Sequence, residues 1–134
     1  GAADLFKGLA AKGYRPLYLT ARGSGQLDRT RLFLNENKFP AGVIQTSAAK
    51  FIGLSAEPAI LYKAGVLQRY LDAGFKLDYG FGNTATDAHA YARAMIPASQ
   101  RYFVKFDELE GLGGETISSY PELKGLPSAL NLCQ

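Results

Sequence analysis

Five side chains in three short stretches could carry chemistry. The hydroxyl of Thr20 and the guanidinium of Arg22 stand two positions apart and are followed by small residues, a combination suited to binding a phosphate. The amide of Asn83 stands four positions before the carboxylate of Asp87, and both offer the oxygen donors that Mg²⁺ prefers. Lys63 lies between these stretches, and its ammonium could neutralise a phosphate and a nearby carboxylate. These residue types suggest phosphate chemistry assisted by a magnesium ion.

Each of these residues also has a purely structural interpretation. Thr20 can end a strand, and Arg22 can lie exposed on the loop that follows. Lys63 can be solvated, as most helical lysines are. Asp87 can cap the following helix, where the helix dipole favours it, while Asn83 tolerates a left-handed turn. The local sequence leaves both interpretations open, so the elements that position these side chains must be considered.

The hydrophobic pattern alternates between helix and strand along most of the chain. It predicts helices over residues 3–12, 26–37, 58–73 and 87–95, and strands over residues 14–20, 43–45, 77–81 and 101–106. Strands that alternate with helices pair in parallel through right-handed crossovers, so we expect an α/β fold, a Rossmann-like parallel sheet with helices on both faces. Ligands bind beyond the carboxyl ends of such strands, where Thr20 and Asn83 fall. We expect this domain to cover residues 1–110 and an irregular tail to cover residues 111–134.

Composition excludes several classes of protein. The chain has 134 residues, 47% of them apolar and 20% charged, which fits one folded domain and rules out intrinsic disorder. A net charge of +3 without a basic run gives little support for nucleic-acid binding. His89 and Cys133 are the only residues of their types, which excludes His-rich metal sites, zinc clusters and intrachain disulfides and leaves the redox compartment undetermined. Any catalysis must therefore rest on carboxylates, lysine or a metal held by oxygen.

Membrane insertion is not expected from the sequence. No apolar run reaches the roughly 18 residues that span a bilayer, and the first residues are too polar for a signal-peptide core. We therefore expect no transmembrane segment or export signal in this chain and favour a cytoplasmic location. Any contact with a membrane would be peripheral.

The chemical residues occur in an order that resembles a known family. The matching stretches are residues 13–22 (GYRPLYLTAR), 39–43 (FPAGV), 62–63 (YK) and 82–87 (GNTATD). Over about residues 3–110 the chain is similar to the haloacid-dehalogenase superfamily. More narrowly, it resembles the lipin-type domain found in phosphatidate phosphatases and at the C-terminal end of retinal-degeneration-B-type phosphatidylinositol transfer proteins.

The resemblance implies a role for each residue. Thr20 would bind the phosphoryl group through its hydroxyl, and Lys63 would stabilise that group as the catalytic lysine. Asn83 and Asp87 would form the magnesium end of the site. Arg22 would be an accessory phosphate contact.

One motif of the superfamily is absent from this sequence. No Asp-x-Asp-x-Thr occurs, and in the superfamily its two aspartates act as nucleophile and general acid/base on a strand that precedes the first helix seen here. By the family pattern that strand lies in the middle of the sheet, between the strands ending at Thr20 and Phe81. We expect an upstream segment of the same protein, direct pairing of the two edges or a strand from a second copy to fill this place. We favour the upstream segment, because a helix beginning at Ala2 or Ala3 looks like the middle of a domain.

Three functions are compatible with these features. The first is a Mg²⁺-dependent phosphatase-like domain acting on a phosphomonoester such as phosphatidate, inactive without the upstream nucleophile segment. The second is a non-catalytic module of a lipid-transfer-type protein that binds phosphatidate or a phosphoinositide through Thr20, Arg22 and Lys63. The third is a structural domain, which would make three ordered matches coincidental. The expected partners are a phosphate-bearing small molecule or lipid head group, and the segment or second copy that completes the sheet, but no nucleic acid.

Overall fold

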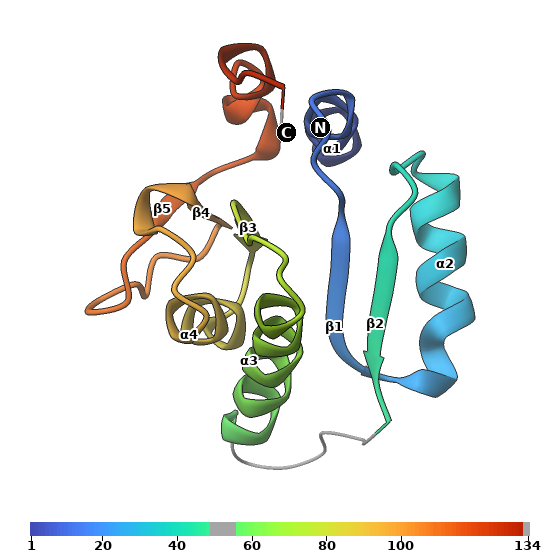
Figure 1. The fold of residues 1–134 in the computed structure, drawn as a ribbon, viewed down its shortest axis with the longest axis vertical. Helices are drawn as coiled ribbons and strands as arrows, with labels where there is room; N and C mark the ends of the chain where they lie inside the picture. Colours follow the sequence, from blue (N-terminus) through green and yellow to red (C-terminus); the bar gives the residue numbers. More distant parts are fainter. Residues whose placement is uncertain (49–55, 133–134) are drawn as a thin grey trace. The chain divides into compact units, whose positions relative to one another are not determined.

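The computed structural model describes residues 1–48 and 56–132, so Cys133 and most of the unpatterned stretch 46–56 lie outside the described residues. The helices are α1 (Ala2–Ala11), α2 (Leu27–Glu36), α3 (Glu57–Asp72) and α4 (Ala85–Arg93), and the strands are β1 (Leu17–Gly23), β2 (Val43–Ser47), β3 (Gly80–Gly82), β4 (Arg101–Val104) and β5 (Glu115–Ile117) (Figure 1). Short 3₁₀ helices are η1 (Ser24–Gln26), η2 (Ala98–Gln100), η3 (Tyr120–Leu123) and η4 (Pro127–Ala129). None of the described helices has the length and apolar character needed to cross a membrane.

The strands form two parallel sheets, one in each of two compact units. The first unit comprises Gly1–Lys50 and Ser119–Gln134 and contains the sheet of β1 and β2. The second unit, Phe51–Ser118, contains β3, β4 and β5 in that order. Every pair of strands is parallel, which confirms the predicted α/β class. Among the described strands, β1 and β3 each have a partner on one side only. The strand expected between them stays a prediction.

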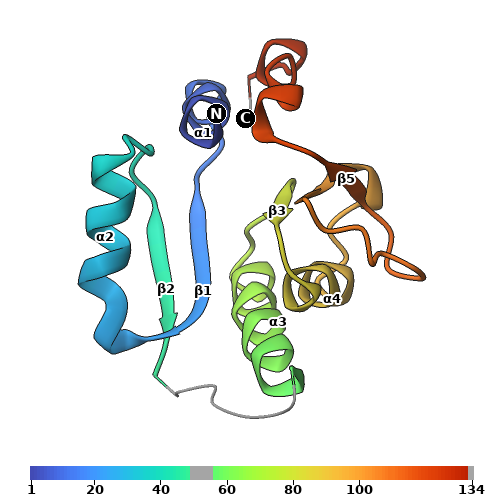
Figure 2. The same cartoon turned by 180° about the vertical axis from the view of Figure 1, so that it is seen from behind.

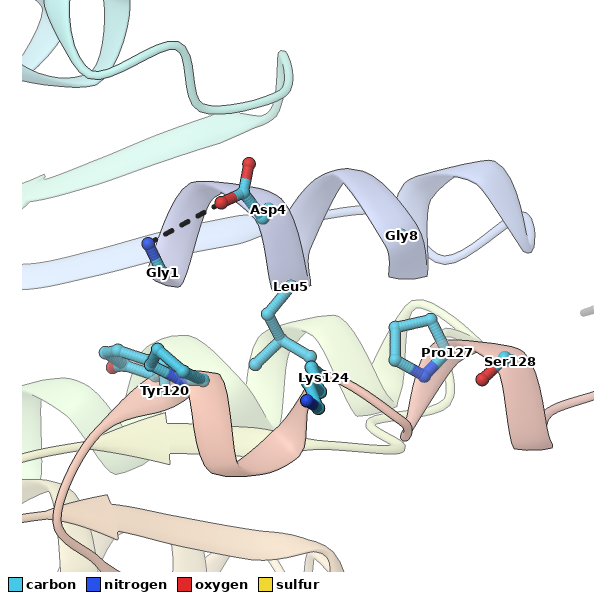
Figure 3. Close-up of a pocket in the computed structure, with 9 residues that line it drawn as sticks. Gly1, Asp4, Leu5, Gly8, Tyr120, Lys124, Pro127 and Ser128 are labelled. Carbon is cyan, nitrogen blue, oxygen red and sulfur yellow. Dashed lines mark ion pairs between the residues drawn. The ribbon is translucent and has the colours of Figure 1, made fainter.

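The first unit is built on the apolar face of α1. Leu5 and Leu9 are buried at helical spacing, and Phe6 joins an aromatic cluster with rings from β1, the loop before β2 and η3. A groove of about 290 Å³ lies between α1 and the η3–η4 segment (Figure 3). A Cβ added at Gly8 would come within 2.8 Å of the Pro127 ring, so the helix and this segment approach closely. The described residues that line the groove include none of the five chemical residues.

In the first unit β1 follows α1, and α2 connects β1 to β2 and packs along β2. Both views show this helix beside the strand (Figures 1 and 2). Tyr18 of β1 donates its hydroxyl proton to the carbonyl of Pro40 at 2.6 Å, which ties the strand to the turn that starts β2. This bond fixes the amino-terminal end of the two-stranded sheet.

The second unit packs α4 tightly against its sheet. A Cβ at Gly80 would lie 2.7 Å from the ring of Tyr91, and one at Gly82 would lie 2.6 Å from Cβ of Asp87. Both strand positions therefore require glycine. The Tyr91 ring stacks on Phe103 at a centroid distance of 6.0 Å, and Phe103 is fully buried. The close approach at Gly82 sets where the first turn of α4 lies.

All four predicted strands differ from their predicted bounds, and β5 was not predicted as a strand. β1 runs to Gly23 rather than ending at Thr20, because a bulge keeps the polar residues within the strand. β3 begins at Gly80 rather than at residue 77, because β4 begins at Arg101, which is the partner of Gly80. β5 lies in the segment predicted as an irregular tail and pairs with β4. The domain division at residue 110 stays a prediction.

Candidate functional site

Lys63 and Asp87 form a buried ion pair between α3 and α4. Lys63 follows Ile60 by three positions and precedes Leu67 by four, so the apolar stripe that turns α3 inward also turns Lys63 inward. Asp87 lies in the first turn of α4. The Nζ atom of Lys63 is 2.7 Å from Oδ1 of Asp87, and the two side chains are 9% and 12% exposed. Lys63 is therefore not a solvated helical lysine.

The start of α4 holds the Asp87 carboxylate in place. Thr84 is the N-cap of the helix, and its Oγ1 accepts a hydrogen bond from the Asp87 N–H at 3.3 Å. The same hydroxyl donates to Oδ2 of Asp87 at 2.8 Å, and the Asn83 N–H donates to Oδ2 at 3.2 Å. The reciprocal bonds between Thr84 and Asp87 are close to those of a capping box. Asp87 therefore supports the helix start and also balances the charge of Lys63.

Thr86 connects the ammonium to this cap. Lys63 Nζ donates to Oγ1 of Thr86 at 2.8 Å, and that oxygen lies 3.0 Å from Oγ1 of Thr84. Neither threonine was expected from the sequence to be part of the site. The Thr-x-x-Asp spacing before an alanine-rich helix was the signal that could have found Thr84. No local signal could have found Thr86, because its partner Lys63 lies 23 positions earlier on another helix.

Thr20 and Arg22 lie together in the first unit, inside the bulge of β1. The strand is in register with β2 at Leu19 and again at Gly23, but between these points three residues of β1 stand opposite one residue of β2. The Arg22 N–H donates to Oγ1 of Thr20 at 3.2 Å, and the Arg22 side chain is exposed. Since Thr20 Oγ1 accepts this bond, its own proton can be donated elsewhere. Bulges often re-aim side chains next to functional sites.

The oxygen donors at Asn83 and Asp87 suit Mg²⁺ in kind. From the described residues, Oδ2 of Asp87 accepts two hydrogen bonds and Oδ1 accepts one, which leaves Oδ1 a lone pair toward them. Asn83 is exposed. Mg²⁺ is commonly held by one or two carboxylates together with waters and a substrate phosphate. Residues 1–48 and 56–132 contain no group of three His, Cys, Asp or Glu residues that could hold a metal. Asn83 and Asp87 can therefore supply part of a magnesium site and need further ligands.

Tyr62, which precedes Lys63 in the matched motif, is protonated at neutral pH. Burial raises the pKa of its phenol, and the positive charge of Arg69 opposes this effect. Tyr62 therefore adds no negative charge beside Lys63. The anion that balances the ammonium is the carboxylate of Asp87.

The structure defines the class of the protein as an α/β domain with a buried cation beyond the carboxyl end of a parallel strand, the place where such folds bind ligands. Comparison with known proteins gives the family. The family model described as "PITM 1-3, LNS2 domain" matches residues 1–105. The chain therefore belongs to the LNS2 domain family, which confirms the lipin-type resemblance stated from the sequence.

Two curated relatives are similar to most of this chain. Phosphatidic acid phosphohydrolase 1 of Saccharomyces cerevisiae is 30% identical over 153 aligned residues, which cover 96% of this chain and 17% of that protein. Nuclear elongation and deformation protein 1 of Schizosaccharomyces pombe is 30% identical over 120 residues, which cover 78% of this chain and 18% of that protein. The chain spans less than a fifth of the length of either relative.

Proposed function

We propose that this domain binds a phosphomonoester in a phosphatase-type site and that phosphatidate is its ligand. The buried ammonium of Lys63 is the observation that supports the binding of an anion. Thr86 and Asp87 engage two of its three N–H groups, and no described residue engages the third. A cation held from one side in a dry environment is suited to receive a phosphate oxygen. The name of the budding-yeast relative, a phosphatidic acid phosphohydrolase, supports the choice of ligand.

Charge balance supports a requirement for Mg²⁺. A phosphomonoester carries about −1.5 to −2 charges at neutral pH, whereas the Lys63–Asp87 pair carries no net charge. We assign Asn83 and Asp87 as magnesium ligands and Arg22 as an accessory phosphate contact. Mg²⁺, when bound, would supply positive charge to the phosphate oxygens. Thr20 would donate its hydroxyl proton to the phosphate.

Hydrolysis would need an attacking group that these 134 residues do not carry in the family's form. The sequence contains no Asp-x-Asp-x-Thr motif. With an aspartate supplied by an upstream segment, attack on phosphorus would expel the alcohol and form an acyl phosphate that water then hydrolyses. Lys63 would neutralise charge that develops on the phosphoryl oxygens. We therefore propose that the 134-residue chain binds its ligand without turnover.

Two measurements on the 134-residue chain test this proposal. With p-nitrophenyl phosphate and Mg²⁺, we expect no hydrolysis above the blank. Titration with inorganic phosphate and Mg²⁺ should shift the amide signals of Asn83 and Asp87, and Lys63→Met should abolish these shifts. Turnover that survives Asp87→Ala would contradict the proposal, and turnover abolished by it would reveal a nucleophile within these residues. Absence of phosphate-induced shifts would also contradict it.

The alternative is a module that recognises phosphatidate and never hydrolyses it. In this module Thr20, Arg22 and Lys63 would bind the phosphate, and no nucleophile would be needed. The coding sequence immediately upstream separates the two proposals. An Asp-x-Asp-x-Thr motif there supports the phosphatase, and an upstream strand without it supports the binding module. In both cases the domain should sediment with vesicles that contain phosphatidate more than with phosphatidylcholine vesicles.

A further inference from the structure

Four side chains from α3, α4 and the cap of α4 close a ring of hydrogen bonds. Lys63 Nζ contacts Oδ1 of Asp87 at 2.7 Å and Oγ1 of Thr86 at 2.8 Å. The ring continues from Thr86 to Thr84 at 3.0 Å and from Thr84 to Oδ2 of Asp87 at 2.8 Å. The ammonium and the carboxylate are thus joined directly on one side and through two hydroxyls on the other.

The proton positions in this ring follow from the number of donors. Thr84 has one hydroxyl proton, which goes to the carboxylate of Asp87, while its oxygen accepts from the Asp87 N–H. Thr86 must therefore be the donor in the contact between the two threonines. Its oxygen lone pairs then face Lys63, whose ammonium can only donate. Hydrogen bonds are thus donated in one direction, from Lys63 to Thr86, from Thr86 to Thr84 and from Thr84 to Asp87.

Thr86 has no part in capping the helix. The cap is formed by Thr84, whose oxygen accepts from the Asp87 N–H. Among residues 1–48 and 56–132, the hydrogen-bonding partners of the Thr86 hydroxyl are Lys63 and Thr84. Without that hydroxyl, the ammonium would have Asp87 as its one anchor among the described residues, and a lysine head group on one anchor can rotate about its flexible stem. With two anchors, the direction of the third N–H is set.

We propose that Thr86 is a positioning residue that, together with Asp87, fixes the direction in which Lys63 presents its third N–H to a phosphate oxygen. The identity of the ligand, a phosphate, rests on the proposed function. The effect of Thr86 on Lys63 rests only on the geometry of the hydrogen-bonded ring. Small misplacements of a charged group that contacts a ligand are costly, so one anchoring hydroxyl can matter for binding.

The test compares Thr86→Val, which keeps the branched shape, with Thr86→Ser, which keeps the hydroxyl. The first readout is the ¹⁵N–¹H signal of the Lys63 ammonium without ligand, which burial and hydrogen bonding should make visible in the wild type. We expect Thr86→Val to lose the signal and Thr86→Ser to keep it. The second readout is the affinity for inorganic phosphate with Mg²⁺, which we expect Thr86→Val to weaken by about tenfold and Thr86→Ser to preserve.

Thr30→Val is the matched control. The Thr30 hydroxyl donates to the carbonyl of Gln26 at the start of α2 in an exposed contact, so its loss should leave the ammonium signal and the phosphate affinity unchanged. Thr86→Ala serves as a second hydroxyl deletion if the valine variant folds poorly, because alanine favours the helix. A role limited to helix stability would lower Tm and leave the Lys63 signal in place.

Three outcomes would overturn the inference. They are a Lys63 signal that survives in Thr86→Val, a Thr86→Ser variant that behaves like Thr86→Val, and a wild type without the signal. If the wild type shows the signal but binds no phosphate, the proposed function fails, while the first readout still decides the role of Thr86.

Discussion

Removing one partner of the Lys63–Asp87 ion pair should cost far more stability than removing one partner of an exposed pair between the same helices. Asp87→Asn removes the negative charge while keeping the shape of the side chain. The variant leaves the buried ammonium of Lys63 2.7 Å from a neutral amide. Two N–H groups of this ammonium still point at residue 87 and Thr86. Removing one partner of a buried pair costs about 3–5 kcal/mol, because the remaining charge is desolvated without compensation. For a domain of this size that is a fall in Tm of roughly 10–20 °C.

A second ion pair supplies the reference for this magnitude. Arg93 of α4 and Glu57 of α3 lie 3.0 Å apart, but their side chains are 45% and 52% exposed. Exposed pairs contribute about 0–1 kcal/mol, so Arg93→Met should change stability by no more than that. The two pairs link the same helices at similar distances and differ in burial. The difference between the variants therefore combines desolvation of the charge with the loss of the bonds by which Asp87 supports the start of α4, and the double-mutant cycle separates the two.

The assay is urea unfolding followed by far-ultraviolet circular dichroism, with a double-mutant cycle for the buried pair. The chain has eight tyrosines and no tryptophan, so tyrosine fluorescence gives a second probe. Lys63→Met combined with Asp87→Asn should be less destabilised than the sum of the single variants by about 2–3 kcal/mol. If Asp87→Asn costs no more than Arg93→Met, the ammonium is well hydrated. Lys63 would then not be a desolvated cation available to a phosphate.

Two further predictions concern the surroundings of the pair. Gly82→Ala should destabilise the domain by about 1–3 kcal/mol and remove the Lys63 ammonium signal, because the new Cβ would lie 2.6 Å from Cβ of Asp87. Gly65→Ala, where no atom lies within 4 Å, should instead stabilise α3 by about 0.5–1 kcal/mol, and equal effects of the two changes on urea unfolding would refute the packing argument. Burial raises the pKa of Tyr102, so stability should be fully present below about pH 10 and fall as the pH rises through the raised value. Tyr102→Phe should lessen this fall in Tm at alkaline pH, and unchanged slopes would contradict the assignment.

The helices could be predicted from the sequence because their apolar spacing reports burial directly. The stripe through Ile60 and Leu67 placed α3 within one residue of its observed bounds, and the same stripe explains why Lys63 points inward. The three-stranded sheet was harder, because β3 and β5 have three residues each. The bounds of such short strands depend on the strand that pairs with them and not on a local sequence pattern. The start of β3 at Gly80, for example, is set by its partner Arg101.

The charged residues of the site could be named from their types, but their partners could not. Nothing in the spacing shows that Lys63 and Asp87 meet, since they lie 24 positions apart on different helices. From the sequence, Asp87 could be either a metal ligand or the cap of a helix. In the structure Thr84 is the cap, and Asp87 is the anion of a buried pair. Tertiary packing supplies such partners and acts on the whole unit, while the magnesium role of Asp87 stays a prediction.

The bulge in β1 shows the same limit at the backbone level. A strand that ends at Thr20 and a strand that bulges there have the same local sequence, because the difference lies in how many residues of β2 stand opposite. The bulge brings the Arg22 N–H to Oγ1 of Thr20, which would not follow from a regular strand, where successive amides alternate in direction. This bond uses a lone pair of Thr20 Oγ1 and leaves the hydroxyl proton available, so Thr20 can act as a hydrogen-bond donor. A donor is what a phosphate oxygen requires, so the irregularity that the pattern could not predict supports the role that the residue type suggested.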